Sequence, residues 1–273
     1  MVLAAVFGIG IATHVSRFLN LEFDGDSESR LAGGPGTPVR DESFYLGEAT
    51  TAFQNGNFES ALRLFGRVIE FNPNNPAAWA GQVRMLIELG EFNEAKLWAD
   101  KALERFPREA ELLAAKAVAL GRSGDIQGAM AFSDAAVEER GDTPYVWLAR
   151  GDVLLSTEQR RAESCIEKAL LLAPADWLVR WLAARIEFYY DRFGCALKFL
   201  QQAVELNASH FLLWLELGQC QQALGLLHPA RDSFGVARQL NPRCTEASLQ
   251  LARVSHAGLR DHARGWWRRL FKR

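Results

Sequence analysis

Residues 79–107 read WAGQVRMLIELGEFNEAKLWADKALERFP, and this segment contains two stripes of apolar residues at helical spacing. The first half places Trp79, Val83 and Leu86 about one turn apart, which predicts an amphipathic helix. Gly90 follows, and glycine most easily takes the positive φ angle that ends a helix. The second half has its own apolar stripe, which begins at Phe92. The segment is therefore predicted to be two helices joined by a turn.

The same pattern recurs along the chain with a period of 33 or 34 residues. Alanine marks the second helix of each unit, at Ala61, Ala95, Ala129, Ala162, Ala196, Ala230 and Ala263. Glycine lies five residues before five of these, at Gly56, Gly90, Gly124, Gly225 and Gly258. Proline lies twelve residues after four of them, at Pro73, Pro107, Pro174 and Pro242. Because three residue types keep one phase, we predict a tandem array of helix pairs in which alanine allows close helix packing.

Residues 42–273 resemble the tetratricopeptide repeat (TPR) family in the order of their aromatic, glycine, alanine and proline positions. Residues in the first aromatic position are Trp79, Trp147, Trp214 and Tyr45, and those in the second are Phe65, Phe234 and Trp267. Gly151 and Gly218 match the glycine of the first helix. The resemblance implies an all-α fold, a right-handed superhelix (an α–α solenoid) of seven helix-turn-helix repeats with the last acting as a cap.

The first 23 residues form an apolar segment that is a candidate membrane anchor. Residues 2–15 carry no formal charge, and apolar residues continue to position 21. A bilayer span needs about 20 apolar residues, so residues 2–21 predict a single N-terminal span. The alternatives are a signal peptide and an N-terminal helix buried against protein. Residues 24–41 are rich in Gly, Pro, Ser and Asp, which predicts a flexible linker.

The last twelve residues, HARGWWRRLFKR, combine tryptophan with arginine. Ala263, Trp266, Trp267 and Leu270 share one face of a helix in this segment, with the basic residues opposite. The repeat phase favours the second helix of a seventh unit, and the alternative is a helix that binds an anionic membrane surface.

Composition and motifs disfavour several function classes. The formal net charge is −2, which gives no overall attraction for nucleic acid, and no nucleic-acid partner is expected. The four cysteines have no C-x-x-C spacing, the five histidines are scattered, and no metal or cofactor is expected. Phosphate-binding, zinc-protease and serine-hydrolase motifs are absent from the sequence, so we predict a protein that is not an enzyme.

Family resemblance places the partner-binding surface in the groove lined by the first helices of the repeats. In the later repeats this register gives an aromatic and aliphatic set with a few polar groups: Tyr145, Leu148, Asp152, Trp181, Arg185, Phe188, Tyr189, Leu212, Leu215 and Gln219. Such a set is suited to a peptide or amphipathic helix that inserts apolar side chains, with aromatic residues such as Trp181 as hot spots. The alternative is that Trp181 and Tyr189 pack against a neighbouring repeat.

These observations predict a TPR scaffold that mediates protein–protein interaction, with a protein or peptide of unknown identity as its partner. Its predicted localisation is membrane-anchored through residues 2–21, and the alternative is cytoplasmic. The alternative function is a soluble accessory subunit of an enzyme or assembly complex.

Overall fold

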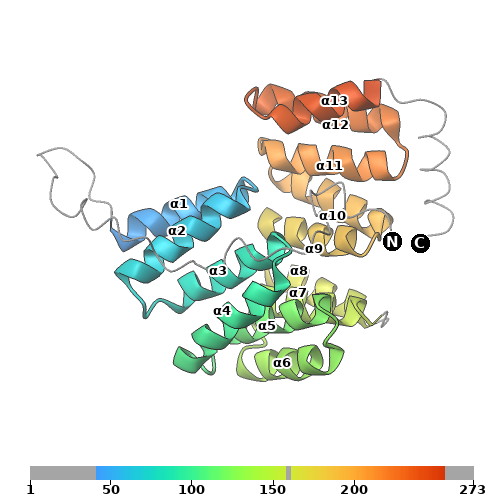
Figure 1. Ribbon diagram of the computed structural model, residues 1–273. Helices are drawn as coiled ribbons and strands as arrows, with labels where there is room; N and C mark the ends of the chain where they lie inside the picture. The colour runs from blue at the N-terminus through green and yellow to red at the C-terminus, as the bar shows by residue number, and fades with distance from the viewer. Residues whose placement is uncertain (1–40, 158–160, 256–273) are drawn as a thin grey trace, which may run out of the picture. The chain divides into compact units, whose positions relative to one another are not determined.

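The computed structural model describes residues 41–157 and 161–255, which form helices with no strand among them (Figure 1). The helices are α1 (Glu42–Gln54), α2 (Phe58–Phe71), α3 (Pro76–Glu88), α4 (Phe92–Arg105), α5 (Ala110–Arg122), α6 (Ile126–Glu139), α7 (Pro144–Leu155), α8 (Ala162–Leu172), α9 (Trp177–Tyr189), α10 (Phe193–Leu206), α11 (Phe211–Ala223), α12 (Leu227–Leu240) and α13 (Thr245–Ser255). The prediction of an all-α helical-repeat solenoid is confirmed. The predicted N-terminal apolar helix lies outside the described residues.

The chain divides into two compact units at Gly141 and Asp142. Unit 1 contains α1 to α6 and unit 2 contains α7 to α13. Within each unit the helices form successive antiparallel pairs, with α1, α3 and α5 as first helices in unit 1 and α7, α9 and α11 in unit 2 (Figure 1). α13 follows α12 and packs against it.

The repeated alanines lie where the two helices of each pair meet. Ala61, Ala95, Ala129, Ala162, Ala196 and Ala230 all have an exposed fraction of 0%. Glycine has the same role opposite an aromatic ring: a Cβ on Gly218 would lie 2.6 Å from the Phe234 ring, and the Phe234 side chain is itself fully buried. Small residues at these positions therefore allow the helix backbones to approach closely.

The turn within five of the helix pairs uses a left-handed residue. Gly56, Gly90, Gly124 and Gly225 have φ between 72° and 96°. At the corresponding point of the α9–α10 pair the chain has Asp191 instead, with φ 59°. Aspartate tolerates this conformation better than most residues, which explains why the pair forms without the glycine.

Replacing Gly124 by alanine should destabilise the protein by about 1–2 kcal/mol, because a Cβ is disfavoured at its φ of +96°. Since a Cβ there would meet no atom within 4 Å, the cost comes from the backbone alone. Gly47→Ala is the matched control: Gly47 is exposed within α1 with the same open surroundings, so alanine should stabilise the protein by about 1 kcal/mol. Urea denaturation of the two variants measures both changes, and a shift of the same sign in both would contradict the assignment.

The predicted localisation, a membrane anchor with a single N-terminal span, is wrong: across residues 41–157 and 161–255 no helix is both long and apolar enough to cross a bilayer. The physical reason is length. The helices have 11 to 14 residues, roughly 20 Å at most, whereas a span needs about 20 residues. The predicted span at residues 2–21 lies outside the described residues, as does the predicted linker except for Asp41.

Candidate partner-binding surface

The ten residues predicted to bind a partner lie on the first helices of unit 2, and we call them the first-helix surface. Tyr145, Leu148 and Asp152 lie on α7, Trp181, Arg185, Phe188 and Tyr189 on α9, and Leu212, Leu215 and Gln219 on α11. They therefore come from three helices of one compact unit. Their exposure divides them into two groups.

One group is buried and forms part of the packing between helices. Its members are Leu148, Asp152, Trp181, Leu212 and Leu215. Trp181 has an exposed fraction of 0%, so its side chain packs inside unit 2, and the hot-spot role expected for it needs correction. Its indole nitrogen has a polar partner on α11, which the repeat register does not reveal.

That partner is Glu216 of α11. The Trp181 Nε1 donates a hydrogen bond to Glu216 Oε2 at 2.7 Å, and the Arg185 Nη1 donates to Glu216 Oε1 at 2.6 Å. The Arg185 guanidinium also lies 5.2 Å from the centre of the Trp181 ring. Arg185 and Glu216 side chains are only 14% and 11% exposed, so this ion pair is largely screened from water. It fixes α9 against α11.

A second polar contact fixes α9 against α7. The hydroxyl of Tyr190, which follows the last residue of α9, donates to Asp152 Oδ1 at 2.8 Å. The same hydroxyl lies 3.1 Å from the Asp152 carbonyl oxygen. Because Asp152 is buried, this bond satisfies an acceptor that would otherwise cost free energy. Asp152 is therefore part of the frame that holds the surface.

The other group reaches solvent: Tyr145, Arg185, Phe188 and Gln219 are partly exposed, and Tyr189 is 41% exposed. The Tyr189 ring meets the Tyr190 ring edge-on with centroids 5.0 Å apart. The Phe188 ring meets Phe193 of α10 in the same way, also at 5.0 Å. Phe188 and Tyr189 follow Arg185 by three and four residues on α9, which places the three on one face of the helix. The surface therefore offers both apolar and polar contacts.

A buried glutamate of α9, Glu187, lies in the sequence between the exposed residues of this surface and has a strongly shifted pKa. Glu187 is 1% exposed, and burial raises the pKa of its carboxyl group from 4.5 to about 7, while the charge of Arg192 lowers this pKa and that of Glu163 raises it. The Arg192 Nε lies 2.9 Å from Glu187 Oε2, and its Nη2 bonds to Glu163 of α8. These three side chains thus connect α8, α9 and the N-cap of α10. The carboxyl group of Glu187 can change its charge near neutral pH.

Sequence reasoning did not single out Glu216, Tyr190 or Glu187. Each is a polar residue on or next to a first helix, and none belongs to the ten residues that the register assigns to the groove. For the two glutamates the available signal was a charged residue surrounded by apolar ones on a helix, which often marks a buried, paired group.

The residue types that bind metals are not clustered in the part of the chain that is described. No group of three or more histidine, cysteine or acidic residues there could hold a metal ion. The four cysteines are free thiols, and burial raises the pKa of Cys220 to about 12. Cys165 and Cys220 are buried among helices, where a cysteine acts as a small apolar residue.

Comparison with known proteins gives one family match. Residues 52–119 match the model of the family described as tetratricopeptide repeat. The curated protein "BBSome complex member BBS4" of Bos taurus is 21% identical over 153 residues. That match covers 56% of this chain and 30% of the bovine protein, so this chain spans less than a third of the relative's length.

Two solved structures have a similar fold. A thermophilic TPR protein of Thermus thermophilus superposes with a TM-score of 0.51 and 24% identity, covering 66% of this chain and 98% of that one. A tetratricopeptide repeat protein from Parabacteroides merdae superposes with a TM-score of 0.50 and 15% identity, covering 81% of this chain and 87% of that one. At these sequence identities, the similarity to the two structures shows a shared fold alone.

Proposed function

Since this chain is a helical-repeat protein of the tetratricopeptide type, we propose that it is a non-enzymatic scaffold that binds a peptide or helix of a partner protein. The fold is one used for protein–protein interaction. In our proposal the binding site is the solvent-reaching part of the first-helix surface, Tyr145, Arg185, Phe188, Tyr189 and Gln219. The buried residues of that surface then serve as its frame.

The observation that carries this proposal is the exposure of Tyr189, one helical turn after Arg185 on α9. Arg185 is itself held by its ion pair with Glu216 of α11. A large aromatic side chain that is 41% exposed can bury more of its area when a partner binds. Its edge-on contact with Tyr190 restricts its motion, which lowers the entropy cost of binding. Tyrosine and arginine are also among the residue types that are enriched at interface hot spots.

Tyr189→Ala tests this site. Loss of an aromatic hot spot costs about 2 kcal/mol, so the dissociation constant should rise about 30-fold. Proteins that copurify with the tagged chain are identified by mass spectrometry, and the most abundant one is titrated against purified variants. The urea midpoint should stay close to that of the parent because Tyr189 contributes little to the core.

Leu171→Ala is the matched control, since Leu171 is 79% exposed on α8, a second helix. It removes a comparable apolar side chain from a different face and should leave affinity unchanged. The proposal is wrong if Tyr189→Ala binds the partner as tightly as the parent does, or if both variants lose affinity equally.

A second candidate function is an accessory subunit of a multiprotein assembly. The similarity to the bovine BBSome complex member favours it, over 56% of this chain. In that case the chain would copurify in fixed stoichiometry with several proteins and use more than one surface. Size-exclusion chromatography separates the two candidates: a complex that stays intact in Tyr189→Ala favours the accessory subunit.

A further inference from the structure

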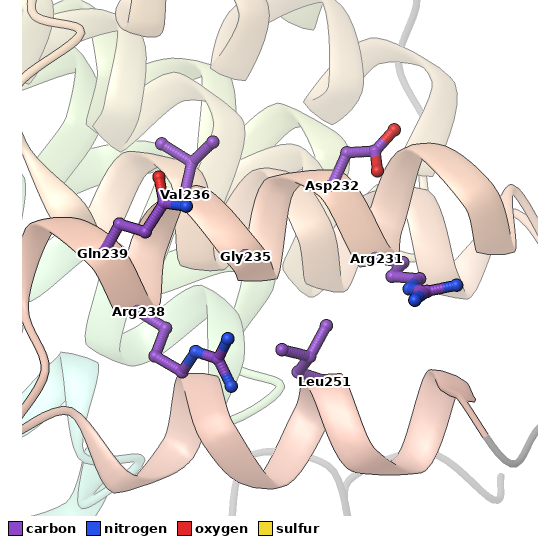
Figure 2. Close-up of a pocket in the computed structure, with 7 residues that line it drawn as sticks. All are labelled: Arg231, Asp232, Gly235, Val236, Arg238, Gln239 and Leu251. Carbon is purple, nitrogen blue, oxygen red and sulfur yellow. The ribbon is translucent and has the colours of Figure 1, made fainter.

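A hollow of about 410 Å³ lies along α12 next to α13, and we call it the α12–α13 hollow. Arg231, Gly235 and Arg238 line it from α12, and Leu251 lines it from α13. Figure 2 shows Arg238 and Leu251 in the space between the two helices, with Arg231 further along α12. A Cβ on Gly235 would meet no atom within 4 Å, so the backbone of α12 is open to a partner at this point.

The two arginines give the hollow its charge. Both are exposed, and neither forms an ion pair with another of the described residues, whereas Arg185 of the same unit is paired with Glu216. Asp232 also lines the hollow, but Figure 2 shows its carboxylate on the side of α12 away from α13. The side of the hollow that faces α13 therefore has two positive charges, and the described residues supply no counter-ion for them.

The part of the chain that contains the hollow is basic. Residues 227–273 include ten lysines and arginines and three acidic residues, whereas residues 1–226 include 21 basic and 30 acidic residues. So uneven a distribution attracts an acidic partner to this part of the chain and repels a basic one. We therefore expect the occupant of the hollow to be acidic.

The spacing of the arginines indicates the form of the occupant. Arg231 and Arg238 are seven residues apart on α12, so they lie on one face with about 10 Å of helix between them. A partner helix has the same spacing between its own residues i and i+7. In an extended strand, residues on one side are about 7 or 13 Å apart, which matches less well. Since Gly235 has no side chain, a helix can also approach closely, and the geometry favours a helix.

The shape of the hollow favours a protein over a lipid surface. Gly235 lies between two long side chains, with Leu251 beside it on α13. A bilayer surface is broad and flat, so its headgroups reach the arginines without filling the space between them. An apolar side chain of a partner helix fills that space and buries apolar surface against Leu251.

We propose that the α12–α13 hollow binds an acidic helix of a partner protein. Two carboxylates of that helix, seven residues apart, pair with Arg231 and Arg238, and an apolar side chain between them enters the hollow over Gly235. This inference is independent of the proposed function, because the first-helix surface lies on α7, α9 and α11. A chain with both surfaces brings two proteins together.

A designed peptide tests the proposal on the full chain. The probe is a fluorescein-labelled, alanine-rich helical peptide with glutamate at i and i+7, leucine at i+4, and a side-chain staple on its other face. Its binding, measured by fluorescence anisotropy, should saturate and should weaken as salt is added. The double variant Arg231→Gln with Arg238→Gln should raise the dissociation constant by about tenfold, because two ion pairs are lost. Gly235→Phe should raise it by about as much while the charge stays the same, because the ring fills the hollow.

Arg253→Gln is the matched control for charge, since Arg253 is exposed on α13 and does not line the hollow. It should leave the dissociation constant nearly unchanged. Tyr189→Ala should also leave it unchanged, so failure of this inference can be told apart from failure of the proposed function. The urea midpoints of Arg231→Gln and Gly235→Phe show that these variants are folded.

Several results would overturn the proposal. One is a parent chain that does not bind the peptide, or that binds it equally well when both glutamates are replaced by glutamine. Another is a Gly235→Phe variant that binds as tightly as the parent, or an Arg253→Gln variant that loses as much affinity as the double variant. Vesicles of phosphatidylserine and phosphatidylcholine that bind the parent but not Gly235→Phe would identify a lipid headgroup as the occupant instead.

Discussion

Glu216→Ala should lower the free energy of unfolding by about 3–5 kcal/mol, measured by urea denaturation. The substitution removes one carboxylate that accepts hydrogen bonds from Trp181 at 2.7 Å and from Arg185 at 2.6 Å. Trp181 is fully buried and the Arg185 side chain is only 14% exposed. The variant therefore loses two bonds and removes a carboxylate from beside a nearly buried positive charge.

Two further variants separate the effect of the lost hydrogen bonds from the effect of the lost negative charge. Glu216→Gln keeps an acceptor for Trp181 but removes the charge, so its loss of stability should be smaller than that of Glu216→Ala. The double variant Arg185→Leu with Glu216→Leu removes both charges and should be less destabilised than the sum of the single variants. Additive losses would show that Arg185 and Glu216 do not act as a pair.

An exposed ion pair of unit 1 provides the matched control. Arg108 Nε lies 2.9 Å from Glu139 Oε1, but the Arg108 side chain is 82% exposed. Because water and salt screen exposed charges, Arg108→Gln should leave stability nearly unchanged. A loss as large as that of Glu216→Ala would mean that the contact geometry, and not burial, determines the strength of these pairs.

The repeat phase was sufficient to predict the helix pairs. Alanine at a 33- or 34-residue period places one small residue where each pair meets, and the six of these alanines that are described are fully buried. Glycine five residues earlier predicts a left-handed turn, and four of those glycines have positive φ. These signals are local, because a small side chain and a positive φ depend on the residue itself and its nearest neighbours.

The exposure of the first-helix surface was not predictable in the same way. Leu148 and Trp181 occupy register positions that face the groove, yet both are buried. The partner of its indole nitrogen is a glutamate of the next repeat, at a sequence separation of 35. The spacing of apolar residues indicates on which face of a helix a residue lies. It does not indicate how closely the next helix approaches or which side chain fills the space between them.

The second large effect concerns the pH dependence of stability at Glu187. Burial raises the pKa of this carboxyl group from 4.5 to about 7 in the folded protein, against the opposing charge of Arg192. Between these two pH values the folded state binds more protons at this group than the unfolded state does. Stability therefore falls as the pH rises through this window, by about 3 kcal/mol for this pKa change. At higher pH the cost is constant because both states are ionised.

Glu187→Gln should remove this dependence, since glutamine remains neutral. The measured quantity is the difference in unfolding free energy between variant and parent from about pH 4 to pH 8, and it should increase by about 3 kcal/mol in favour of the variant. Subtraction cancels the titration of all other groups, and loss of the contact with Arg192 adds only an offset where Arg192 stays charged. A difference that is constant with pH would mean that the Arg192 charge, 2.9 Å away, keeps Glu187 ionised throughout, so that attraction outweighs burial at this position.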